Sequence, residues 1–250
     1  MRALTPPERL IVAADFRPNT TVGNGPISSV ESQVLSLAYR LKGTGVYLKM
    51  NSALRACGYG LIEKVHSYGL RVCADLKLFD IKETLSIDGV LLGGAKPELV
   101  TAVCFASIIP MQVLKKTISE VLPDTEVLGV TVLTCLSDAD MDMMFQSTVD
   151  AGVSRLAHIG ESAGIDGFVC SAMEAPLIRS VVKRPMTINT PAIRPIWAIV
   201  HGDDQNPERI MTPVKARRAG ADRIVVGRPI VNAPNPYDAV MRTIEEIESV

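Results

Sequence analysis

Three charged residues stand close together in the stretch CADLKLFDIKET, residues 73–84, directly after an apolar run. They are Asp75, Lys77 and Asp80. A spacing of two puts Asp75 and Lys77 on one side of an extended strand, so a carboxylate and an ammonium group would lie side by side. A fixed ammonium group can stabilise negative charge that develops on a bound molecule and can then supply a proton. One lysine cannot neutralise two carboxylates, so we expect a second cation nearby.

Two further charged residues end neighbouring apolar runs. Lys49 lies near the end of the otherwise apolar VYLKM, and Asp15 ends IVAAD. Alone, such a lysine commonly extends along the surface and such an aspartate commonly caps a turn. Together with Asp75 and Lys77, they place charge at the ends of three successive predicted strands. That pattern favours an active site over a structural ion pair.

Gly227 and Arg228 follow the last apolar run of the chain, in VVGRPI. A free backbone N–H group and a guanidinium group are both suited to binding a phosphate. In many barrels the loop after the last strand holds a phosphate group. On these residues alone, a turn glycine followed by a solvated arginine stays an equal alternative.

The elements that must position these residues are eight short apolar runs with amphipathic patterns between them. Strands that are apolar throughout are typical of a parallel sheet covered by helices, and eight such units predict a single α/β domain, a (β/α)8 barrel over residues 1–250. An open doubly wound sheet is the alternative, although the Gly-rich fingerprint of its dinucleotide-binding form is missing. The predicted strands are 9–15, 45–50, 70–76, 99–105, 127–134, 166–171, 185–190 and 222–227, and the predicted helices include 28–42, 53–69, 110–122 and 138–152.

Two long connections interrupt this alternation, at residues 16–28 and 191–210. In a barrel both follow the carboxyl end of a strand, where binding loops gather. We therefore expect both connections to be active-site loops.

Composition limits the class of ligand and the compartment. The chain has 47% hydrophobic residues and a formal net charge of −1, which gives no long-range attraction to nucleic acid or to an anionic membrane. The five cysteines are scattered without a CxxC pair, so neither a disulfide framework nor a zinc site is predicted. We expect a cytoplasmic protein that binds a small molecule.

Beyond these separate signals, the chain resembles the orotidine 5′-monophosphate decarboxylase family. The stretch DLKLFDI at 75–81 matches the family's DxKxxDI signature, which a wider suprafamily shares. The ordered set of motifs is more specific and spans almost the whole chain. It comprises IVAAD at 11–15, LKM around Lys49, VTVLT at 130–134, TPAIRP at 190–195, DQ…RIMTP at 204–213 and GADRIVVGRPI at 220–230.

This resemblance implies a decarboxylase that forms UMP in pyrimidine biosynthesis with no metal and no cofactor. It implies that Lys77 is the catalytic proton donor and that Asp75 lies against the substrate carboxylate. Lys49 would complete the charge array and contact the ribose, and Asp80 would reach across a homodimer interface. The implied substrate-binding residues are Asp15 and Thr84 for the ribose, Thr134 near the pyrimidine, and Arg194, Gln205, Gly227 and Arg228 for the phosphate.

The chain departs from the family pattern at three places. Cys104 stands where a histidine is usual after the fourth strand, and Cys135 replaces the usual serine of an LTS turn. The segment IWAIVHGD, residues 196–203, is longer and more apolar than the usual loop. These departures concern the shape of the turns and the position of Gln205, and the charge array is unaffected.

Two alternative functions stay open at this point. The sugar-phosphate branch of the same suprafamily uses Mg²⁺ held by a glutamate on the second strand, where this chain has Lys49. Because an ammonium group repels a divalent cation, the substitution favours the metal-free reaction. A catalytically silent nucleotide-phosphate binding protein is the other alternative.

Overall fold

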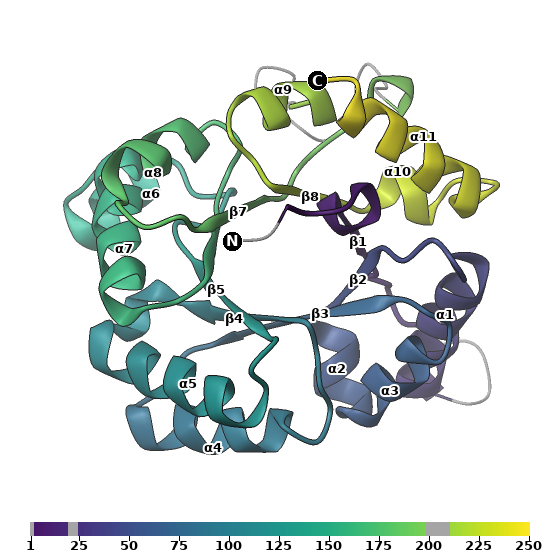
Figure 1. Ribbon diagram of the computed structural model, residues 1–250, viewed down its shortest axis with the longest axis horizontal. Helices are drawn as coiled ribbons and strands as arrows, with labels where there is room; N and C mark the ends of the chain where they lie inside the picture. The colour runs from purple at the N-terminus through teal and green to yellow at the C-terminus, as the bar shows by residue number, and fades with distance from the viewer. Residues whose placement is uncertain (1–2, 20–24, 199–210) are drawn as a thin grey trace.

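The computed structural model describes residues 3–19, 25–198 and 211–250. Within these residues eight parallel strands form a closed barrel in chain order, with β8 pairing back to β1. Figure 1 looks along the barrel and shows the helices as an outer ring. The predicted (β/α)8 fold is confirmed. The strands are β1 (Leu10–Ala13), β2 (Tyr47–Met50), β3 (Arg71–Leu78), β4 (Leu99–Val103), β5 (Glu126–Val130), β6 (Gly167–Val169), β7 (Thr187–Thr190) and β8 (Arg223–Val226).

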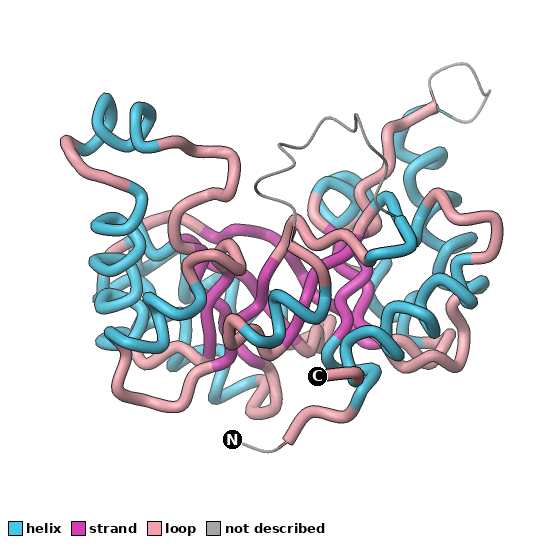
Figure 2. Tube along the Cα trace, turned by 90° about the horizontal axis from the view of Figure 1, so that it is seen from above, coloured by secondary structure: helices cyan, strands magenta, loops and turns pink. Residues whose placement is uncertain are grey.

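Helices separate consecutive strands and cover the outside of the barrel, which Figure 2 shows from the side. No helix in the described part of the chain is long and apolar enough to cross a membrane. The helices are α1 (Gly25–Arg40), α2 (Ser52–Cys57), α3 (Gly60–His66), α4 (Lys82–Leu92), α5 (Ile108–Val121), α6 (Asp138–Phe145), α7 (Val149–Ala163), α8 (Ala175–Val181), α9 (Pro213–Arg218), α10 (Arg228–Val231) and α11 (Pro236–Glu248), with short 3-10 helices η1 (Pro6–Arg9), η2 (Cys104–Ala106) and η3 (Ile196–Ala198).

Two of the predicted helices are each divided into two by a residue with a left-handed backbone. The segment 53–69 forms α2 and α3, because Gly58 has φ 78° and ends α2. The segment 138–152 contains α6 and the start of α7, because Gln146 has φ 48° after α6. A new helix, α7, then begins at Val149, and the side chain of Thr148 caps it. Periodicity alone detects the buried face of such segments but not the break within them.

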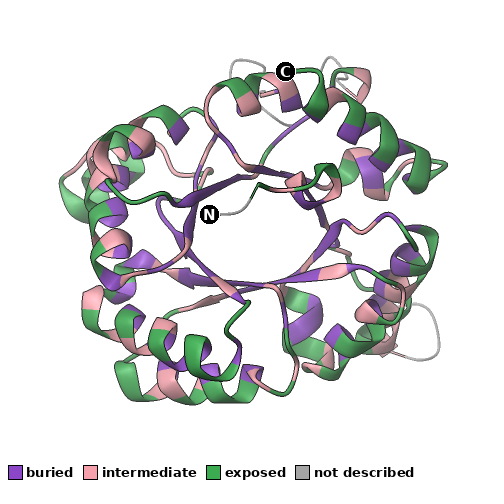
Figure 3. Ribbon diagram, in the orientation of Figure 1, coloured by how far each residue is buried: buried purple, intermediate pink, exposed green. Residues whose placement is uncertain are grey.

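The core follows from the pattern of apolar residues along each helix. In α7 the buried residues Val153, Leu156, Ala157 and Gly160 recur at spacings of three and four, so one face packs on the barrel. Figure 3 shows this arrangement, with buried strands inside and exposed residues mainly on the outer faces of the helices. A Cβ at Gly160 would stand 2.5 Å from the ring of Phe168, so α7 approaches β6 closely at a residue without a side chain.

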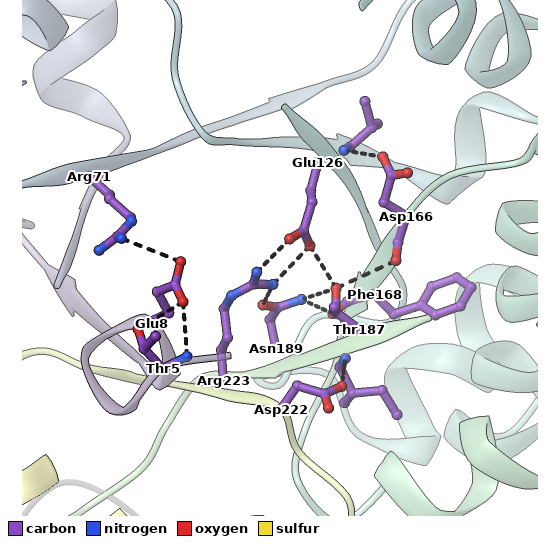
Figure 4. Close-up of polar contacts among 12 residues, drawn as sticks. Thr5, Glu8, Arg71, Glu126, Asp166, Phe168, Thr187, Asn189, Asp222 and Arg223 are labelled. Atoms are coloured by element: carbon purple, nitrogen blue, oxygen red, sulfur yellow. Dashed lines mark hydrogen bonds and ion pairs between the residues drawn. The ribbon is translucent and has the colours of Figure 1, made fainter. Parts of the chain in front are cut away.

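A residue with a carboxylate side chain stands directly before every second strand of the barrel, from β4 onward. Glu98, Asp166 and Asp222 each directly precede a strand, and each accepts a hydrogen bond from the backbone N–H group of the second residue of the preceding strand. These bonds tie neighbouring strands at the amino-terminal end of the barrel, and Figure 4 labels two of the three carboxylates. The donors are Val72 in β3 at 2.6 Å, Val127 in β5 at 2.7 Å and Ile188 in β7 at 2.7 Å.

A buried ion pair closes the same end of the barrel. Arg223 at the start of β8 is fully buried and donates two hydrogen bonds to the carboxylate of Glu126 at the start of β5, at 2.9 and 2.5 Å. It also donates to Asn189 Oδ1 at 3.2 Å, and its guanidinium group lies 5.4 Å from the ring centre of Tyr47. Figure 4 shows Arg223 of β8 meeting Glu126 of β5, with Asn189 of β7 beside them.

We predict that Glu126→Ala lowers the free energy of unfolding by about 3 kcal/mol, because it leaves the buried Arg223 charge without its partner. Urea unfolding followed by circular dichroism measures the change. Glu120→Ala is the matched control, since it removes only the exposed Lys116–Glu120 pair of α5 at 3.9 Å and should change stability by less than about 0.5 kcal/mol. Equal stability of the two variants would contradict the role given to the Glu126–Arg223 pair.

Candidate active site

Four charged side chains form a line of alternating charge at the carboxyl ends of the first three strands. Lys49 near the end of β2 donates from Nζ to Asp15 Oδ2 at 2.9 Å and to Asp75 Oδ2 at 3.1 Å. Lys77 donates from Nζ to the same Asp75 oxygen at 2.7 Å. The order is therefore Asp15, Lys49, Asp75 and Lys77, with one carboxylate oxygen between two ammonium groups.

Asp75 is buried and stays ionised because its carboxylate contacts the ammonium groups of Lys49 and Lys77. Burial by itself would raise the pKa of the Asp75 carboxyl, but the ammonium groups of Lys49 and Lys77 outweigh burial and lower it to about 2. Its second oxygen accepts a hydrogen bond from the Thr101 hydroxyl at 3.0 Å. Asp75 is thus a permanent anion at neutral pH, held on both oxygens.

Lys49 is also held in its charged form. Burial disfavours the ammonium group, but the nearby carboxylates of Asp75 and Asp15 reverse the effect and raise the pKa of Lys49. Its side chain is 14% exposed, whereas that of Asp15 is 57% exposed. The array therefore runs from solvent at Asp15 into the interior at Asp75.

The end of β3 departs from regular strand geometry. Ala74 pairs with Val100 and Leu78 pairs with Ala102. Between these two pairs β3 advances by four residues and β4 by two. Lys77 lies in this irregular stretch with φ 50°, a left-handed conformation that is uncommon for a residue with a side chain. Asp75 and Lys77 lie side by side, as their spacing of two predicted, and the register shift places both in an irregular stretch of β3 that the sequence did not reveal.

A pocket of about 350 Å³ opens over this array. Its volume is in the range of small-molecule sites, and its walls are mainly apolar with few charged groups. The four array residues line it together with residues from the other strands. The remaining described lining residues are Ile11, Ala13, Cys73, Thr101, Leu128, Val130, Val132, Leu133, Thr134, Cys135, Val169, Cys170, Asn189, Pro191, Ala192, Ile193, Arg194, Val225, Gly227 and Arg228.

The expected phosphate-binding residues Arg194, Gly227 and Arg228 line the pocket on the side of β7 and β8. Arg194 is buried, and its backbone N–H group donates to the carbonyl of Met211 at 3.0 Å. Ile193 forms an isolated parallel bridge with Met211, which joins the two described ends of the connection after β7. The structure thus brings two arginines and a backbone glycine to one wall of the pocket.

The segment that follows Arg194 is attached to the last helix. The N–H group of Ile196 donates to the Glu246 carboxylate at 3.1 Å, and the guanidinium group of Arg242 lies 4.7 Å from the ring centre of Trp197. Both partners belong to α11. Residues 196–198, the described start of the unusual 196–203 segment, therefore contact α11 and are not among the described residues that line the pocket.

Two expected site residues lie away from the pocket, and one cannot be placed. Asp80 is exposed and its Oδ1 accepts from the N–H group of Ile81 at 2.7 Å. Thr84 lies in the first turn of α4. Neither is among the described residues that line the pocket. Gln205 lies outside the described residues, as does most of the expected loop 191–210.

The cysteines that depart from the family pattern have different surroundings. Cys135 is exposed and lines the pocket beside Thr134, which is half-buried. Cys104 is fully buried, burial raises the pKa of its thiol to about 12, and it packs against Gly129 of β5. The substitution at Cys135 thus changes a pocket wall, whereas the one at Cys104 changes the packing behind the strands.

Sequence reasoning missed two polar residues of the pocket, Thr101 and Asn189. Both lie within strands and are almost fully buried. Threonine is an ordinary strand residue, so Thr101 gave no signal of its own. Asparagine is uncommon in strands, so the position of Asn189 in a buried apolar run was the available signal for a polar residue of the pocket.

Comparison with known proteins identifies the group to which this barrel belongs. The sequence model of the "Orotidine 5'-phosphate decarboxylase / HUMPS family" matches residues 8–243. The chain belongs to this family. The resemblance inferred from the sequence motifs is therefore confirmed.

Curated members of the family match over most of the chain. The orotidine 5′-phosphate decarboxylase of Hahella chejuensis is 35% identical over 194 residues, covering 77% of this chain and 82% of the relative. That of Nitrosococcus oceani is 29% identical and covers 97% of this chain and 98% of the relative. The crystal structure of the Lactobacillus acidophilus orotidine 5′-phosphate decarboxylase shares the fold, with a TM-score of 0.80, 24% identity and coverage of 96% and 99%.

The lowered pKa of Asp75 predicts how stability depends on acid. A carboxyl whose pKa is lower in the folded state stabilises the fold above its unfolded pKa, and this contribution is lost as pH falls towards the folded value of about 2. Relative to Asp75→Asn, the wild-type protein should therefore lose about 2 kcal/mol between about pH 4 and about pH 2. Urea unfolding of both proteins across this range measures the difference. A constant difference would contradict the ion pairing of Asp75.

Proposed function

We propose that this protein decarboxylates orotidine 5′-monophosphate to uridine 5′-monophosphate in pyrimidine biosynthesis, without a metal ion or a cofactor. The observation that carries the proposal is the array of Asp15, Lys49, Asp75 and Lys77 beneath the pocket. The names of the curated relatives add support, since all those compared above are orotidine 5′-phosphate decarboxylases.

Lys77 supplies the charge and the proton in this reaction. The bond between the pyrimidine ring and its carboxylate breaks, CO₂ leaves, and the electron pair stays on the ring carbon. The ammonium group of Lys77 is already fixed where this negative charge develops, so little reorganisation is needed. Lys77 then donates a proton to the ring carbon to form the C–H bond, and solvent reprotonates the amine.

Asp75 acts on the substrate carboxylate. Two carboxylates about 4 Å apart repel by roughly 4 kcal/mol at an effective dielectric constant of 20, and this repulsion is relieved when CO₂ departs. The same carboxylate also holds the two ammonium groups in place. The ammonium groups that lower its pKa keep it ionised at neutral pH before the substrate enters.

The phosphate group binds at the opposite wall of the pocket. Arg194, Gly227 and Arg228 offer two guanidinium groups and a backbone N–H group there. We assign Gln205 to the same phosphate by the family resemblance. Binding a part of the substrate that does not react supplies energy that orients the pyrimidine against Lys77.

The ribose and the pyrimidine lie between the phosphate-binding wall and the charge array. Asp15 and Lys49 reach the ribose hydroxyls, since both line the pocket and Asp15 lies at its solvent side. Thr134 and Cys135 form the pocket wall that faces the pyrimidine. We assign Thr84 to the ribose by the family resemblance, although it is not among the described residues that line the pocket.

Lys49 argues against the Mg²⁺-dependent sugar-phosphate reaction. A divalent cation prefers oxygen ligands, and the Asp75 oxygen that could bind one is occupied by the ammonium groups of Lys49 and Lys77. The proposed reaction therefore continues in the presence of a chelator.

The test follows the absorbance of orotidine 5′-monophosphate with purified protein and EDTA. We predict rapid conversion to uridine 5′-monophosphate by the wild-type protein, and a loss of several orders of magnitude in kcat for Lys77→Ala, because the proton donor is removed. Lys116→Ala, which removes an exposed lysine of α5, is the control and keeps full activity. No conversion by the wild-type protein, or normal turnover by Lys77→Ala, would refute the proposal.

The protein acts as a homodimer in which Asp80 completes the site of the partner subunit. Asp80 lies outside its own pocket, between the exposed side chains of Phe79 and Ile81, which are 62% and 63% exposed. The exposed apolar surface continues along α4, and a surface of this kind favours contact with another chain. Its members on α4 are Ile87, Val90 and Leu91.

We predict that Asp80→Ala is inactive alone but recovers activity when mixed with inactive Lys77→Ala. A hybrid dimer then has one complete site, with Lys77 from one chain and Asp80 from the other. At equal amounts, half the dimers are hybrids, so about a quarter of wild-type activity returns. The mixture is refolded together from urea so that subunits exchange. No recovery in that mixture would contradict a shared site.

A further inference from the structure

Thr101 of β4 lies beside the irregular end of β3. Its side chain is 2% exposed and lines the pocket, although it carries no charge. It faces β3 at the point where the pairing between the two strands shifts, between Ala74 and Leu78. At such a point the backbone of β3 loses regular partners on β4.

The Thr101 hydroxyl replaces a missing partner and makes a second bond. It accepts a hydrogen bond from the backbone N–H group of Lys77 at 2.9 Å and donates one to Asp75 Oδ1 at 3.0 Å. A hydroxyl has one hydrogen to donate, and a backbone N–H group can only donate, so these directions are fixed. One oxygen atom therefore joins the two central residues of the charge array.

Each of these two hydrogen bonds restrains a degree of freedom that the ion pairs do not restrain: the rotation of the Asp75 carboxylate and the backbone of Lys77. Both ammonium groups contact Oδ2 of Asp75, so the bond to Oδ1 fixes the rotation of the carboxylate plane. Lys77 has φ 50°, a conformation that a residue with a side chain rarely keeps unless its surroundings hold it. The bond to its N–H group holds the backbone from which the ammonium group extends.

We propose that Thr101 is a positioning residue that sets the Lys77 backbone and the Asp75 carboxylate plane together through its hydroxyl. The proposal rests on the proposed function for its kinetic consequence. Thr101 does not touch the reacting atoms in this role. It acts through Lys77 and Asp75.

The test compares Thr101→Val, which keeps the shape but removes the hydroxyl, with Thr101→Ser, which keeps the hydroxyl. We predict that Thr101→Val lowers kcat by about 100-fold with little change in KM, because a misplaced catalytic group slows the chemical step more than binding. Thr101→Ser should retain most of kcat. Thr243→Val, which removes a buried hydroxyl bonded to the Ala239 carbonyl in α11, is the control and keeps wild-type kcat.

A second measurement does not depend on activity. Residue-resolved amide hydrogen exchange should show faster exchange of the Lys77 N–H group in Thr101→Val than in the wild-type protein or in Thr101→Ser. Unchanged exchange and unchanged kcat in Thr101→Val would overturn the proposal, and so would an equal loss of kcat in both Thr101 variants. If the wild-type protein lacks turnover, the proposed function fails, and the exchange comparison then decides the positioning role by itself.

Discussion

The site depends on one carboxylate oxygen placed between two ammonium groups. Asp75 Oδ2 lies 3.1 Å from Lys49 Nζ and 2.7 Å from Lys77 Nζ, and without this anion the two cations would repel one another in a half-buried setting. β2 and β3 are neighbours in the barrel, so the fold itself brings these side chains within reach. The lowered pKa of Asp75 and the raised pKa of Lys49 both result from the same contact.

The interior of the barrel has charged groups at both ends and an apolar layer between them. The layer consists of residues from several strands, and some of them also form the floor of the pocket. Asn189 links the levels, since it lines the pocket while accepting from the Arg223 guanidinium group below. The apolar layer separates the array from the Glu126–Arg223 pair, so each cluster is neutralised locally. Its buried members are Ile11, Tyr47, Cys73, Leu99, Leu128 and Val225.

The strands and the array were predictable because their signals are local. A buried parallel strand is apolar throughout, and a charge at its end, as at Lys49, stands out. Contacts between distant segments were not predictable in this way. Glu126 and Arg223 are 97 positions apart, and nothing in either neighbourhood indicates the other. The bulge at Lys77 and the hydrogen bonds of the Thr101 hydroxyl depend on the pairing of β3 with β4. The sequence of each strand taken alone does not predict that pairing.

The closed amino-terminal end of the barrel determines how molecules pass through the pocket. Arg223 is fully buried there, with its guanidinium group over the ring of Tyr47 and bonded to Glu126, so among the described residues these side chains fill the barrel below the apolar floor. The nucleotide and carbon dioxide of the proposed reaction would therefore both pass through the opening that the described residues leave at the carboxyl-end rim. In the proposed reaction the small gas is released beneath the larger nucleotide and has to escape past it. The loops at that rim would then determine the order in which carbon dioxide and the nucleotide leave the pocket.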